Sequence, residues 1–174
     1  MSESMKQFQT MGREDLLRTV EMFAKNWLAH DGCWFLAAEE RFGMETAIEL
    51  DAHSWARFAA AEARRIMATF RIPANGGLPA LECALGLRLY SAVNTQHVEW
   101  SGDRQSLRFF MDRCRVQQTR ERKGLPDFPC KRVGIVEFET FAKTIDCRIL
   151  TKCLHCPPET PEGHYCGWEF TLEA

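Results

Sequence analysis

The sequence predicts an α+β protein in which an N-terminal helical layer packs on an antiparallel sheet built from two β-hairpins. Two patterns support this prediction. Apolar residues recur at helical spacing from residue 13 to 86, and from residue 90 onward two pairs of alternating segments each flank a turn. With 174 residues, 45% of them apolar, one domain is expected over 1–174, with a helical part at 13–86 and a sheet-and-helix part at 88–172.

Helices are expected at 13–28, 34–42, 44–70 and 78–85. Leu16, Val20 and Phe23 share one face of the first helix, and the Asp31-Gly32 step predicts a turn after it. Gly43 marks the end of the second helix. The large aromatic side chains are expected mostly in the core, namely Trp34, Phe35, Trp55, Phe58, Trp100, Phe109 and Trp168.

The first hairpin is expected to join strands at 90–100 and 105–113 through a two-residue Gly102-Asp103 turn. This register makes Val98 face Leu107 on an apolar side. The opposite, polar side then carries His97, Glu99 and Arg108.

The second hairpin is expected to pair 148–153 with 165–172, which places Cys153 opposite Cys166. Helices at 115–123 and 130–145 connect the two hairpins. Asp127 or a neighbour is expected to cap the second of these helices.

Charge and composition exclude several classes of partner. A net charge of -2 gives no basic excess with which to bind nucleic acid or an anionic membrane surface. No segment resembles a secretory signal or a membrane span, so a cytosolic location is expected. The sequence is compatible with a monomer or a homodimer. In a reducing compartment, the eight cysteines are more readily metal ligands or free thiols than disulfides.

The spacing of three C-terminal cysteines predicts a metal site. Cys153-x-x-Cys156 supplies two thiolates from one turn, and Cys166 returns on the next strand. The fourth ligand is expected to be Cys130, at a helix start that favours thiolate. Four sulfur ligands leave no open position, so the ion would be structural zinc. Weaker candidates for the fourth position are Cys114, His155, His164 and Cys147.

The alternative is that these cysteines are free buried thiols, as Cys33 and Cys83 are expected to be in their helices. An iron-sulfur cluster also accepts four thiolates, but only the Cys-x-x-Cys pair is typical of one. Zinc is therefore favoured.

Two residues are candidates for acid-base chemistry. Glu62 interrupts the apolar stripe of the third helix, where a carboxylate would be desolvated. An interior salt bridge to an arginine such as Arg113 or Arg115 is the favoured explanation, because structural ion pairs also perturb carboxylates. His30 can act as an acid, a base or a hydrogen-bond donor in a cavity, or it can close a helix C-terminus.

Four further residues are candidates for ligand binding. His97 would line a pocket if helices cover its face of the hairpin, and Trp100 is an aromatic residue that would serve if it faces a cavity. Arg113 and Arg115 belong to a basic cluster that can clamp a carboxylate. Otherwise this cluster is a solvated helix face.

Long segments of the chain resemble known families. WLAHDGCWFLAAEERFGMETAIELD, CRVQQTRERKGLPDFPCKRVG, FAKTIDCRI and CLHCPP…YCGWEF resemble a family of prokaryotic cytosolic proteins related to the L-2-amino-thiazoline-4-carboxylic acid hydrolase-like proteins. The order Cys130, Cys153, Cys156, Cys166 is also similar to that of the zinc-binding 4-vinyl reductase domain, with Cys153 where the related sensors carry glutamate. The second resemblance implies an aromatic-lined pocket between sheet and helices.

The favoured function is therefore that of a zinc-stabilised cytosolic domain that binds a small aromatic or heterocyclic carboxylate. The alternative is a hydrolase that opens the C–N bond of a cyclic amidine, as the first resemblance implies. In that case Glu62 or His30 would be the general base and an arginine would hold the carboxylate.

Overall fold

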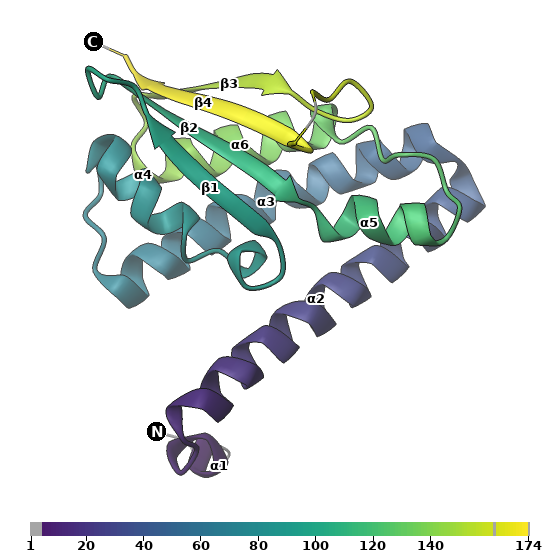
Figure 1. Ribbon diagram of the computed structural model, residues 1–174, viewed down its shortest axis with the longest axis horizontal. Coiled ribbons are helices and arrows are strands. Elements are labelled where there is room, and N and C mark those ends of the chain that lie inside the picture. The colour runs from purple at the N-terminus through teal and green to yellow at the C-terminus, as the bar shows by residue number, and fades with distance from the viewer. Residues whose placement is uncertain (1–4, 162, 174) are drawn as a thin grey trace.

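A four-stranded antiparallel sheet with helices packed on one face forms the body of the protein, as Figure 1 shows for the computed structural model. The structure describes residues 5–161 and 163–173. The predicted α+β architecture is confirmed. The elements, in chain order, are α1 (Lys6–Gln9), α2 (Arg13–Phe42), α3 (Met44–Phe70), α4 (Gly77–Leu85), the 3-10 helix η2 (Leu89–Ala92), β1 (Thr95–Trp100), β2 (Ser106–Arg113), α5 (Arg115–Arg122), α6 (Lys131–Ile145), β3 (Ile149–His155) and β4 (Cys166–Leu172).

The second helix is continuous, so the turn predicted at Asp31-Gly32 is wrong. A helical glycine costs only about 1 kcal/mol, which packing of α2 on α3 can offset. The first half of α2 stands away from the sheet (Figure 1), and Phe23 on the predicted apolar face is 53% exposed. Trp34 is 69% exposed, so its assignment to the core is also wrong.

The core lies between the sheet and the helix pair α3 and α6. Helical spacing gives α6 a buried face that includes Phe138 and Phe141. The approach of this helix to the sheet depends on Gly134, because a Cβ at that position would lie 2.6 Å from a ring carbon of Trp168. Trp168 lies on β4 and is 1% exposed, so the helix and the strand meet without a gap.

The sheet has the order β1-β2-β4-β3, so β4 of the second hairpin lies beside β2 of the first, and β1 and β3 are the edge strands. Residues 88–94 form a connection and η2, and the first strand begins only at Thr95. The predicted two-residue turn is wrong: Trp100 pairs with Leu107, and the Ser101 amide donates to the Ser106 carbonyl across a wider loop. The Asp103 carboxylate accepts a hydrogen bond from the Ser101 hydroxyl and stabilises this loop.

The second hairpin also has a different register from the predicted one. Cys153 pairs with Trp168, and Cys166 pairs with Met111 of β2. The register of β3 shifts between Cys153 and His155, which displaces its end relative to β4. Cys166 therefore does not lie directly opposite Cys153, as predicted, but in another row of paired residues across the sheet.

Among the residues that the structure describes, no helix combines the length and the hydropathy needed to cross a membrane.

Candidate functional site

A cavity of about 360 Å³ lies between the sheet and helices α2, α3, α5 and α6. Its volume is at the small end of the range found for small-molecule sites. Most of its wall is aromatic or aliphatic, with Phe109 and Trp168 from the sheet and Trp55 from α3. Polar groups are confined to a few places on this wall, which is the usual composition of a ligand pocket.

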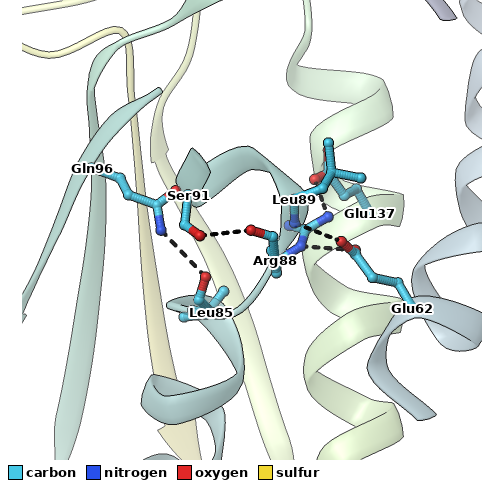
Figure 2. A network of polar contacts seen from close by, with 7 residues as sticks. All are labelled: Glu62, Leu85, Arg88, Leu89, Ser91, Gln96 and Glu137. Atoms are coloured by element: carbon cyan, nitrogen blue, oxygen red, sulfur yellow. Dashed lines mark hydrogen bonds and ion pairs between the residues drawn. The ribbon is translucent and has the colours of Figure 1, made fainter. Parts of the chain in front are cut away.

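The main polar group of the cavity is Arg88, which follows α4 and is 3% exposed (Figure 2). Its Nε donates to Glu62 Oε2 at 2.9 Å. Its Nη2 forms an ion pair with Glu137 Oε1 at 2.7 Å. The guanidinium also lies over the Phe141 ring at 4.6 Å. Arg88 thus joins α3, α6 and the segment before β1.

The backbone around Arg88 is held by further hydrogen bonds (Figure 2). The Leu89 amide donates to Glu62 Oε1 at 3.4 Å, and the Ser91 hydroxyl donates to the Arg88 carbonyl at 2.7 Å. The Gln96 amide group donates to the Leu85 carbonyl at 3.3 Å. Both ends of the segment that carries the arginine are therefore tied to neighbouring elements.

Carboxyl groups outnumber the cation at this end of the cavity. Burial raises the pKa of Glu137, although Arg88 opposes this effect. Burial also raises the pKa of Asp51 from 3.8 to about 7, with a further contribution from the negative charges of Asp31 and Glu137. Burial would lower the pKa of Arg88, but the two facing glutamates outweigh it and raise the pKa. This end can therefore accept a proton or a hydrogen-bond donor near neutral pH.

The two predicted acid-base residues lie outside the cavity wall. Glu62 is buried and ion-paired, but its partner is Arg88 and not Arg113 or Arg115. His30 is exposed on α2. A catalytic role for either residue remains a prediction.

The predicted ligand-binding residues are spread over three places. Arg115 lines the cavity, together with the exposed Arg122 and Lys123. Arg113 is exposed and lies outside the cavity wall. Trp100 lies elsewhere, where its indole N–H donates to Glu82 at 3.0 Å.

Four cysteines lie close together beside the cavity, and three of them, Cys130, Cys156 and Cys166, line it. The Sγ atoms of Cys153 and Cys156 are 3.6 Å apart, and the Cys156 thiol also interacts with those of Cys130 and Cys166. The hydrogen bonds to these two thiols, together with burial, raise the pKa of Cys156. The structure thus gathers the four residues that the sequence predicted as ligands. No three of these four sulfurs lie mutually within 4.8 Å. Cys130, Cys153 and Cys166 therefore each lie closer to Cys156 than to one another.

The other cysteines differ from this cluster. Cys33 and Cys83 are exposed, so the prediction that both are buried thiols is wrong. Cys147 is exposed as well. Cys114 lies near the cluster, and burial raises the pKa of its thiol to about 12. All eight cysteines are free of disulfide bonds.

His97 lies on the face of the sheet opposite the cavity, as the predicted polar face of the hairpin required. Its Nδ1 is 2.8 Å from Asp112 Oδ2, and the Nδ1 of His164 is 2.8 Å from Asp112 Oδ1. Burial raises the pKa of Asp112, but the hydrogen bonds from the two histidines outweigh it and lower the pKa. The three residues present ligand atoms within 4.8 Å of one another, and such a group can hold a metal ion.

Sequence reasoning missed three cavity residues, Arg88, Glu137 and Asp51. A signal for two of them was present. Asp51 lies four residues before Trp55, and Glu137 lies beside Phe138, so both fall on or next to the buried stripe of a long helix. Arg88 lies in an irregular segment, where no periodicity indicates burial.

The comparisons with known proteins concern both the family and the fold. Residues 9–172 match the Family of unknown function (DUF6125). No curated protein matches the chain significantly.

Two solved structures resemble this fold. One is a trafficking protein particle complex subunit 3 from Naegleria fowleri covalently bound to palmitic acid, with TM-score 0.53 and 8% identity over 90% of this chain and 96% of that one. The other is the phenol-responsive sensory domain of the transcription activator PoxR with phenol, with TM-score 0.52 and 15% identity over 83% of this chain and 73% of that one. At these identities the likeness concerns the fold.

Proposed function

The chain belongs to DUF6125, a family of unknown function, and we propose that it is a cytosolic ligand-binding domain that encloses a small aromatic or heterocyclic carboxylate. The cavity is the observation that carries this proposal. It is largely apolar, about 360 Å³ in volume, and carries polar groups of opposite charge at different places.

The distribution of charge suggests how such a ligand lies. A carboxylate is best placed beside Arg115 and Lys123, which line the part of the cavity that includes exposed residues. The ring would then pack among the aromatic side chains. A hydroxyl or amino group at the far end would donate to Asp51 or Glu137. A second carboxylate at that end would face Glu137 and Asp51 and be repelled.

The two structural neighbours agree with a small-molecule function. One was solved with phenol and the other with palmitic acid. The sequence resemblance to a domain found in sensors of aromatic effectors leads to the same class of ligand. The volume of this cavity favours a single ring over a long acyl chain.

A structural zinc ion on Cys130, Cys153, Cys156 and Cys166 is the second part of the proposal. A tetrahedral ion with Zn–S bonds of about 2.3 Å has sulfurs about 3.8 Å apart, which is close to the 3.6 Å between Cys153 and Cys156. No three of these sulfurs lie mutually within 4.8 Å, so the other side chains would have to move to complete the tetrahedron when the ion binds. The ion would join the start of α6 to the second hairpin beside the cavity.

The alternative function is hydrolysis of a cyclic amidine such as a 2-amino-thiazoline carboxylate. Asp51 favours it, because a cavity carboxyl group whose pKa is about 7 suits a general base at neutral pH. Asp51 would then take the place that the sequence assigned to Glu62 or His30. The same arginine and lysine would hold the carboxylate.

Binding can be tested by thermal shift and calorimetry with phenol, benzoate and 2-amino-thiazoline-4-carboxylate. We expect the carboxylates to stabilise the wild type. Val116→Trp should abolish this effect by filling the cavity that Val116 lines. The matched control is Ile135→Trp, on a position that is 40% exposed and lies outside the cavity wall. Equal binding by both variants, or no binding to the wild type, would contradict the proposal.

The choice between binding module and enzyme requires a separate measurement. Opening the C–N bond of 2-amino-thiazoline-4-carboxylate with water frees the ring nitrogen as a primary amine and leaves the sulfur in an S-carbamoyl group. Release of this amine would support the hydrolase, and Asp51→Asn should then reduce turnover at least 100-fold. Saturable binding with no amine released would support the binding function and reject the hydrolase.

A further inference from the structure

The outer face of the sheet carries a second cluster of metal-ligating residues, separate from the cysteines. Three of the five histidines of the chain lie there, His97 on β1, His155 at the end of β3 and His164 just before β4. They surround Phe110, whose ring lies 5.2 Å from His97, 6.2 Å from His155 and 4.9 Å from His164.

Strand pairing explains why these residues meet. His97, Phe110, Gly167 and His155 form one row across all four strands, in the order β1, β2, β4, β3. Gly167 leaves room for the His155 ring, because a Cβ there would lie 2.5 Å from His155 Cε1. Asp112 is two residues beyond Phe110 on β2 and therefore shares its face.

Asp112 connects the histidines. Each of its oxygens lies 2.8 Å from an Nδ1 atom, one of His97 and the other of His164. An octahedral ion with bonds of about 2.1 Å has adjacent ligand atoms about 3.0 Å apart, close to these 2.8 Å separations, and the imidazole rings would turn so that their nitrogens face the ion and not Asp112. The side chains are 38%, 25% and 33% exposed for His97, Asp112 and His164, so the ion would keep contact with solvent.

We propose that His97, Asp112 and His164 bind one divalent transition-metal ion of the zinc, cobalt or nickel class. Imidazole ligands select these ions over magnesium and calcium. Three protein ligands on a half-exposed face leave coordination positions for water or an exogenous ligand, unlike a site closed by four thiolates.

His155 adds a polar group at the edge of this site. Its Nε2 is buried and has no hydrogen-bond partner, and its ring centre is 6.3 Å from that of His164. Buried nitrogens of this kind normally have a partner. His155 therefore borders the cluster and is not one of the three proposed ligands.

The two metal-ligating clusters face opposite sides of the same sheet. Met111 and Cys166 pair across β2 and β4 and line the cavity, whereas Asp112, the next residue along β2, faces outward. The outer cluster contains no thiol. The two groups can therefore be distinguished by the ligand atoms that they offer.

Cobalt(II) is a suitable probe for the whole chain, because thiolate ligands give an intense charge-transfer absorption that imidazole and carboxylate do not. We expect the wild type to bind one equivalent of cobalt that adds only weak ligand-field bands, whatever the cysteines bind. His97→Gln combined with His164→Gln should lose this equivalent. The control, His30→Gln combined with His53→Gln, removes two exposed histidines outside the cluster and should retain it.

Two further measurements keep the test independent of the folding of the variants. Zinc added to the wild type should shift the imidazole NMR signals of His97 and His164 and leave those of His30 and His53 unchanged. Asp112→Asn should weaken binding at least 10-fold. Equal cobalt stoichiometry in the wild type and the His97/His164 double variant would overturn the proposal. So would unshifted His97 and His164 signals at saturating zinc, because the cluster would then be only a hydrogen-bonded network. Neither result would contradict the proposed ligand cavity or the proposed cysteine site.

Discussion

Asp51→Asn should stabilise the protein at neutral and alkaline pH. Burial raises the pKa of Asp51 from 3.8 to about 7, so the folded protein holds this proton more tightly than the unfolded chain does. Above pH 7 the carboxyl group is ionised in both states, and the folded state bears the full cost of the buried charge. Below about pH 4 it is protonated in both states, and the cost disappears.

The size of the effect follows from the two pKa values. A rise from 3.8 to about 7 corresponds to about 4 kcal/mol of destabilisation at high pH. Asp51 is only partly buried, and solvent reduces this value. We therefore expect Asp51→Asn to raise the free energy of unfolding by about 2–3 kcal/mol near pH 8, because asparagine has nearly the same shape without the charge.

Urea unfolding of the wild type and the variant, followed by tryptophan fluorescence between pH 4 and pH 8, tests this reasoning. The difference between the two proteins should grow with pH from about pH 4 and level off above pH 7. Asp127→Asn is the matched control, since Asp127 is exposed in the loop before α6. A destabilised Asp51→Asn variant, or a difference that does not change with pH, would refute the assignment of a buried, costly carboxylate to the cavity.

Three further predictions concern the core and the cysteines. Arg88→Met leaves two buried glutamates without their cation and should lower the free energy of unfolding by about 3–5 kcal/mol; a loss below 1 kcal/mol would show that the ion pairs contribute little. Gly134→Ala would place a Cβ 2.6 Å from the buried tryptophan of β4 and should lower the free energy of unfolding by about 1–3 kcal/mol. Gly32→Ala is the control: no atom lies within 4 Å of the new Cβ, so this change should not destabilise α2. Elemental analysis of His97→Gln combined with His164→Gln, which lacks the outer site, should find one zinc per chain; this zinc should be retained when Cys147→Ser is added and lost with thermal stability when Cys156→Ser is added, and an equally stable chain without zinc would reject the cysteine site.

The layout of helices and strands was largely readable from local patterns. The stripe on α3 and the alternation around residue 101 depend only on the periods of a helix and a strand, and these periods are visible in the sequence. The errors fall where tertiary contacts outweigh local signals. Gly32 remains helical within α2, which packs on α3, and the register of each hairpin is set by contacts along the whole strand pair, including irregularities in β1 and β3.

For the candidate sites, the sequence by itself predicted that Cys153, Cys156 and Cys166 lie close together, because ligand spacing within a turn and a hairpin is a local property. It indicated Cys130 only as the preferred fourth ligand, ahead of Cys114. Only the tertiary structure decided that Arg88 pairs with Glu62 and Glu137, and that His97 meets His164 over Asp112. These residues come from segments far apart in the chain. No local period relates such segments, and only the packing of helices and strands brings their charges within a few ångströms.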